Sequence, residues 1–180
     1  MTDASRRNWG WVRPLAWGAA ACLLLLPAVA MQFAPDSGVN WTLGDFVFAA
    51  LMIGGVGLAA ELAVRMNPSW SYRGGAALGL AAGFFLIWAN GAVGYIGSED
   101  NPYNIVFFAV IAVAFGGAVI AGFRAKGMAI AMLAAGLAHA VAGGFGFPQD
   151  PRTGPITLAF VAMWLGSAAL FRKAAREAGA

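Results

Sequence analysis

The sequence predicts an all-α membrane protein, a polytopic bundle of six transmembrane helices with both termini in the cytoplasm. The chain has 180 residues, of which 61% are hydrophobic and 11% charged, whereas soluble chains carry about 25% charged residues. Its apolar residues form continuous runs that are long enough to cross a bilayer, without the alternation of an outer-membrane barrel. Lysine and arginine gather in alternate connections, and that pattern fixes the orientation of a membrane protein.

The apolar runs predict a single transmembrane domain over residues 1–180. A bilayer core needs about 20 apolar residues per helix, and we expect spans near residues 14–33, 42–64, 75–97, 103–123, 128–147 and 155–171. The first run follows a pair of arginines and ends in Ala-Val-Ala, as cleavable signal segments do. Cleavage would leave five spans, but we expect this segment to be retained as the first helix.

The connections between the spans alternate in charge. Three connections are acidic or neutral: residues 34–41, 98–102 and 148–154. Two are basic: residues 65–74 and 124–127. Of the 11 basic residues, only Arg152 lies with the first group; ten lie on the other side: Arg6, Arg7, Arg13, Arg65, Arg73, Arg124, Lys126, Arg172, Lys173 and Arg176. The positive-inside rule makes the arginine-rich side cytoplasmic, so the acidic connections face outward.

The outward connection "SEDNP" places Glu99 beside Asp100 and has two interpretations. In the first, Ser98, Asp100 or Asn101 caps the fourth helix, Pro102 opens it, and the acids favour the positive end of its dipole. In the second, the two carboxylates form the rim of an outer cation or proton entry. A calcium site needs six or more oxygen ligands, so other outward groups would have to converge on this connection.

The preceding outward connection carries a helix-start signal of its own. In "NWTLGD", Thr42 and Asp45 have the spacing of a capping box that opens the second helix. Trp41 is then expected in the aromatic belt at the membrane surface.

Polar residues inside the spans are more informative, because polar groups at membrane depth usually need partners. Glu61 lies one turn before Arg65, and we expect an intramembrane ion pair between them near the cytoplasmic surface. Asn90 and His139 each lie some eight residues below the outer end of a helix, which is roughly 12 Å at 1.5 Å per residue. Equal depth permits contact between these two side chains.

Two interpretations of His139, the only histidine, stay open. It can make an interhelical hydrogen bond, for example to Asn90, worth about 0.6 kcal/mol. Alternatively it is a proton relay or ligand position that is reached from outside, since histidine titrates near neutral pH. In that case an outward polar funnel is expected, formed by Asp45, Asn90, Glu99, Asp100 and His139. One histidine and one cysteine, Cys22, supply too few ligands for zinc or haem, so we expect no metal and no cofactor.

Glycines predict where helices pack. Gly75, Gly79 and Gly83 recur every fourth residue along the third span. Such small residues on one helix face allow close approach of a neighbouring helix. The third span is therefore expected at the centre of the bundle or of a dimer.

The sequence has no phosphate-binding glycine loop, no catalytic triad pattern, no zinc-protease motif and no nucleic-acid module. We therefore expect no enzyme and no nucleic-acid partner. The main hypothesis is a packing or accessory protein of the lipid bilayer that associates with itself or with a larger membrane complex. The alternative is a small channel or carrier for protons, ions or a small solute; an intramembrane enzyme is the third.

Three stretches carry a resemblance: "NWTLGDFVFA", "GLAAELAVR" and "GYIGSEDNPYN". They resemble a group of small multi-pass bacterial inner-membrane proteins of unassigned function. The resemblance covers the first four spans and implies a location in the bacterial inner membrane. It implies no activity.

Overall fold

The computed structural model describes residues 11–179, except for the side chain of Val12. Over these residues the chain is helical, without strands. Six of the helices in this range are long and apolar enough to cross a membrane, as the apolar runs predict. Arg6 and Arg7, two of the ten basic residues on the predicted cytoplasmic side, lie outside the described residues.

The chain divides into two compact units, Met1–Ala59 and Ala60–Ala180, and each is described by itself. In the first unit, α2 (Val12–Phe33) is followed by the short 3-10 helix η1 (Pro35–Ser37) and then by the start of α3 (Leu43–Met66). The predicted capping box is confirmed at the start of α3. Thr42 N donates to Asp45 Oδ2 over 2.7 Å, and Asp45 N donates back to Thr42 Oγ1 over 3.3 Å.

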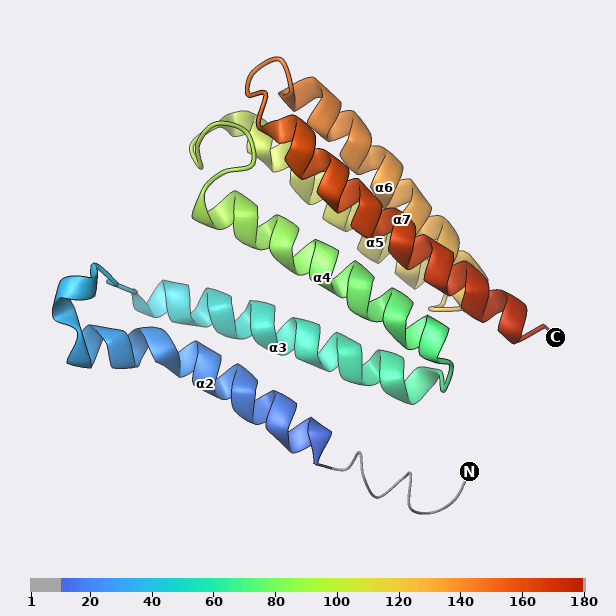
Figure 1. Cartoon of the computed structure of the whole chain (residues 1–180), viewed down its shortest axis with the longest axis horizontal. Coiled ribbons are helices and arrows are strands. Elements are labelled where there is room, and N and C mark those ends of the chain that lie inside the picture. The colour runs from blue at the N-terminus through green and yellow to red at the C-terminus, as the bar shows by residue number, and fades with distance from the viewer. Residues whose placement is uncertain (1–10, 180) are drawn as a thin grey trace. The chain divides into compact units, whose positions relative to one another are not determined.

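The second unit contains the end of α3 and then four long helices: α4 (Trp70–Ala92), α5 (Val106–Ile120), α6 (Ala125–Gly146) and α7 (Thr153–Glu177). A short 3-10 helix, η2 (Pro102–Ile105), leads into α5. Figure 1 shows α4 to α7 as one group, in which α7 packs against both α4 and α6 and α5 packs against α6. Trp164, Phe107 and Phe171 are the largest fully buried side chains of the core.

α4 differs from the predicted span 75–97 at both ends. It begins earlier because Ser69 caps it, accepting a hydrogen bond from the backbone N–H of Tyr72 over 3.3 Å. It ends earlier, at Ala92, and Gly94 follows with a φ of +74°, a backbone conformation that cannot continue a helix.

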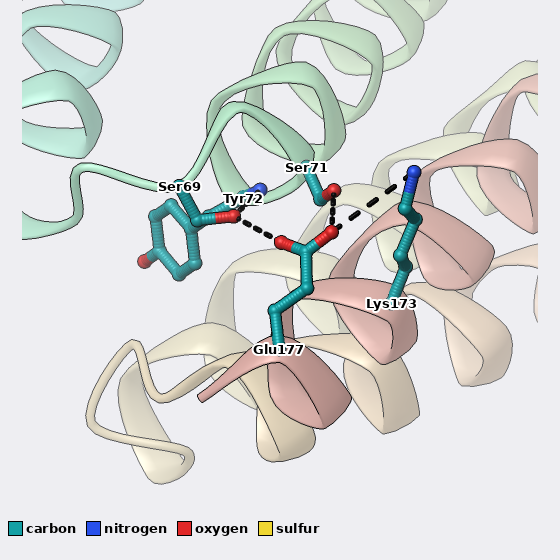
Figure 2. A network of polar contacts seen from close by, with 5 residues as sticks. All are labelled: Ser69, Ser71, Tyr72, Lys173 and Glu177. Atoms are coloured by element: carbon teal, nitrogen blue, oxygen red, sulfur yellow. Dashed lines mark hydrogen bonds and ion pairs between the residues drawn. The ribbon is translucent and has the colours of Figure 1, made fainter. Parts of the chain in front are cut away.

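α7 continues beyond the predicted end at residue 171 as far as Glu177. Glu177 gives the extra turns a partner on another helix. Its carboxylate accepts hydrogen bonds from the hydroxyls of Ser69 and Ser71, each over 2.8 Å, and lies 4.0 Å from the Lys173 ammonium (Figure 2). The last turn of α7 is thereby tied to the start of α4.

Gly75, Gly79 and Gly83 form a stripe of glycines on α4, and this stripe faces three other helices. A Cβ added at Gly75 would lie 3.0 Å from the Phe171 ring of α7, and one at Gly79 would lie 3.0 Å from Ser167 Oγ. The same Gly79 Cβ would lie 3.1 Å from Met132 Sδ of α6, and one at Gly83 would lie 3.8 Å from Ile111 of α5. The missing side chains at Gly75 and Gly79 thus set how closely α4 and α7 approach.

Candidate functional site

The connection from α4 to η2 folds back over the bundle and carries Tyr95 into it. Gly94 and Gly97 have φ angles of +74° and +70°. A Cβ at Gly94 would lie 2.2 Å from the carbonyl carbon of Ser98, so only glycine fits at this turn. Tyr95 and Ile96, between the two glycines, are 4% and 3% exposed.

Asn104 holds this connection in place from inside. Its side-chain Oδ1 accepts hydrogen bonds from the backbone N–H groups of Tyr95, over 3.1 Å, and of Ile96, over 2.8 Å. Its Nδ2 donates to the carbonyl of Ser98 over 2.7 Å. The buried backbone of the turn is therefore satisfied by one side chain, as buried polar groups require.

Tyr95 meets His139 in a buried polar cluster formed by Tyr95, His139, Thr157 and Trp164. His139 is completely buried, and its Nε2 lies 2.9 Å from the Tyr95 hydroxyl. The indole Nε1 of Trp164 donates to His139 Nδ1 over 3.3 Å, and the Tyr95 hydroxyl lies 3.3 Å from Thr157 Oγ1. Helices α6 and α7 and the α4–η2 connection each contribute to this cluster.

Aromatic rings enclose the His139 imidazole on its other sides. The Phe160 ring stacks on it with centroids 5.1 Å apart, and the Phe107 ring lies 5.5 Å away at a tilt. The Tyr95 ring in turn contacts Phe107, with centroids 3.9 Å apart. Phe160 and Phe107 are 8% and 0% exposed, so the polar cluster has an apolar cover.

The partners of His139 determine its tautomer. The Trp164 indole can only donate, so Nδ1 must accept and the neutral imidazole carries its proton on Nε2. Nε2–H then donates to the Tyr95 oxygen, which leaves the Tyr95 hydroxyl proton for Thr157. Burial raises the pKa of Tyr95 to about 12, so this phenol stays neutral. Both ring nitrogens of His139 are occupied by protein groups.

Asn90 and Thr153 are buried, and each has one polar atom without a hydrogen-bond partner among the described residues: Asn90 Oδ1 and Thr153 Oγ1. The Asn90 amide instead donates to the carbonyl of Leu86 over 2.8 Å.

Two other candidates for the funnel, Glu99 and Asp100, lie in the second unit and do not join this cluster. Glu99 and Asp100 lie exposed on the connection whose inner side carries Tyr95. Asp45 belongs to the first unit, where its carboxylate is bound by the backbone N–H and the hydroxyl of Thr42. Asn101 caps η2, accepting a hydrogen bond from Tyr103 N over 3.0 Å, and Pro102 follows it. The sequence "SEDNP" therefore starts the 3-10 helix η2, which leads into α5, with Asn101 as its cap.

Glu61 and Arg65 form an ion pair one turn apart on α3. The Arg65 side chain is 65% exposed and that of Glu61 20% exposed. Pairs of this kind on a helix surface contribute about 0.3–0.5 kcal/mol.

Sequence reasoning missed Tyr95, Asn104 and Thr157. The run through Gly97 continues the apolar third span, so its pattern predicts Tyr95 at a helix end. The two glycines that flank Tyr95 and Ile96 were the available signal for a turn. Nothing in the local pattern distinguishes Thr157 from any other small polar residue in a span.

Among the described residues, no three His, Cys, Asp or Glu side chains lie close enough together to hold a metal ion. Comparison with protein-family models, with curated proteins and with solved structures found no match for this chain. The fold thus defines a class, the helical proteins with several apolar segments of membrane-spanning length. The site within it is a closed hydrogen-bonded cluster.

Proposed function

We propose that this chain is a multi-pass protein of the bacterial inner membrane that acts as a packing or accessory subunit, associating with itself or with a larger membrane complex. The observation that carries the proposal is the closed cluster around His139. Its hydrogen-bonding groups are used on one another, whereas a catalytic or transport group needs a position open to a ligand. The cluster instead joins α6, α7 and the α4–η2 connection.

The first unit supports a role in association. Among the described residues of this unit, two are buried, Pro27 and Ala49. Large apolar side chains on its helices are exposed, among them Leu26 on α2 and Leu51 on α3, at 62% and 71%. Lipid, a second copy or another membrane protein would cover such surfaces.

The proposed orientation places both termini in the cytoplasm, following the distribution of basic residues. Reporter fusions after residues 38, 100 and 151 should report the outside, and fusions after 70, 126 and 178 the inside. An inverted pattern at residues 70, 100 and 126 would refute this orientation.

The association itself is tested on the full chain in native membranes and in nanodiscs. We expect chemical crosslinking in the membrane to give a defined dimer or a defined complex, with the same mass after purification. A chain that stays monomeric under both conditions, and that copurifies with no stoichiometric protein, would contradict the proposal.

A second candidate function is a small proton, ion or solute carrier. It is favoured by the two buried atoms without a partner, Asn90 Oδ1 and Thr153 Oγ1, because buried polar groups usually bind something. Flux measured in proteoliposomes, and lost in Asn90→Leu and Thr153→Val variants that stay folded, would establish this function in place of the packing role.

A further inference from the structure

A groove between α6 and α7 combines positive charge with an apolar lining. It encloses about 650 Å³ and has Lys126, from the first turn of α6, and Arg172 and Arg176, from the last turns of α7, among its lining residues. The rest of its lining is apolar, with Ile130, Leu133, Leu165 and four alanines. All three cations lie at one end, because α6 and α7 are antiparallel.

These three cations have no ion-pair partner among the residues that the structure describes. The neighbouring acid, Glu177, is engaged by Ser69, Ser71 and Lys173 (Figure 2). Arg172 and Arg176 are four residues apart and so lie on one face of α7. Lys126 lines the same groove from α6, so the three charges can converge on one anion.

The apolar part of the groove begins where the charges end. Ile130 and Leu133 follow Lys126 along α6, and Leu165 precedes Arg172 by two turns of α7. The side chains of Ile130, Leu133 and Leu165 are 63%, 45% and 44% exposed. Three alanines of α7, Ala168, Ala169 and Ala175, also line the groove. An occupant must therefore be anionic at one end and apolar over several turns of helix.

We propose that this groove binds one anionic phospholipid, with its phosphate between Lys126, Arg172 and Arg176 and an acyl chain along Ile130, Leu133 and Leu165. Basic pockets between membrane helices on the cytoplasmic side match the charge of such headgroups. The assignment rests on the membrane location in the proposed function, but not on the packing role. A free phosphate would use only the charged end, and an acidic peptide would not need the apolar lining.

The test measures lipid binding to the full chain in a neutral detergent by native mass spectrometry. The probes are phosphatidylglycerol, phosphatidylcholine and inorganic phosphate. The test variant is Arg172→Gln with Arg176→Gln. The matched control, Arg124→Gln with Lys173→Gln, removes the same charge from the same end of the helices but outside the groove. A second pair compares Ala169→Phe, which fills the groove, with Ala162→Phe, an exposed site of α7 outside it.

We expect one phosphatidylglycerol to bind in preference to phosphatidylcholine. At about 1 kcal/mol per basic residue, the Arg172/Arg176 variant should bind it roughly thirtyfold more weakly. The charge control should retain binding, and Ala169→Phe should weaken binding where Ala162→Phe does not.

Equal losses in the two charge variants would overturn the proposal in favour of diffuse attraction. Inorganic phosphate that binds as tightly as phosphatidylglycerol would overturn it in favour of a free-anion site, and unchanged binding in Ala169→Phe would show that no acyl chain lies in the groove. Because native mass spectrometry also reports the oligomeric state, lipid binding and self-association can fail independently of each other.

Discussion

Ser167 on α7 donates a hydrogen bond to the backbone carbonyl of Gly75 on α4, with 2.7 Å between the two oxygens. The contact is possible because Gly75 and Gly79 have no side chains, so the two helices approach until the serine hydroxyl reaches the backbone. Ser167 is completely buried. Glycine at positions 75 and 79 is therefore a condition for this close approach of α7 to α4.

Gly79→Leu should destabilise the bundle, because a Cβ there already meets Ser167 Oγ at 3.0 Å and Met132 Sδ at 3.1 Å. Overpacking of this kind costs about 1–3 kcal/mol. The control is Gly144→Leu on α6, where an added Cβ meets nothing within 4 Å. The control should gain stability from its better helix propensity. Equal melting temperatures for the two variants in detergent would contradict this role of the stripe.

Tyr95→Phe should lower stability by about 1–3 kcal/mol, the cost of leaving a buried polar group without its partner. The variant leaves His139 Nε2 and Thr157 Oγ1 without the hydroxyl that lies 2.9 Å and 3.3 Å from them. Tyr103→Phe is the matched control, since Tyr103 is 55% exposed. We expect thermal unfolding to separate the two variants; a Tyr95→Phe protein as stable as the control would show that the cluster contributes nothing.

Stability should fall as the pH rises from about 10 to about 12. Burial raises the pKa of Tyr95 from 10.0 to about 12 in the folded chain, so the unfolded chain loses this proton first. The contribution of the neutral Tyr95 hydroxyl to the free energy of unfolding is complete below pH 10. It is lost as the pH passes through the pKa of Tyr95 in the folded chain. Unfolding of the parent and of Tyr95→Phe across this pH range provides the measurement. The parent should show the steeper decline, and parallel curves would refute the assignment.

The connection after α4 should tolerate changes at its exposed acids but not at Asn104. Replacing Glu99 with Ser and Asp100 with Asn removes two charges from an exposed turn, so we expect a change under about 1 kcal/mol. Asn104→Leu removes the three hydrogen bonds of the turn and should cost several times as much. Comparable effects in chemical denaturation would mean that the acids, and not Asn104, shape this connection.

The sequence predicts the six apolar helices and the capping box at Thr42 and Asp45, because hydropathy and helix-start signals are local. It does not predict the turn at Gly94, since a run of apolar residues through Ile96 looks the same in a helix and in a buried connection. The partners of His139 are also hidden. Tyr95, Thr157 and Trp164 come from distant parts of the chain, and a hydropathy pattern assigns each of them to the interior without saying what it contacts.

The three hydrogen bonds of Asn104 bear on how the end of the bundle opens. The amide protons of Tyr95 and Ile96 can exchange with solvent deuterium only after their hydrogen bonds to the Asn104 side chain break. We expect the same event to withdraw the Tyr95 ring from His139, because the ring and the two amides belong to one short connection. Exchange at these two amides should therefore proceed at a common rate, and that rate should match the opening of α6 around His139. A connection between two helices would then exchange as slowly as the buried part of α6.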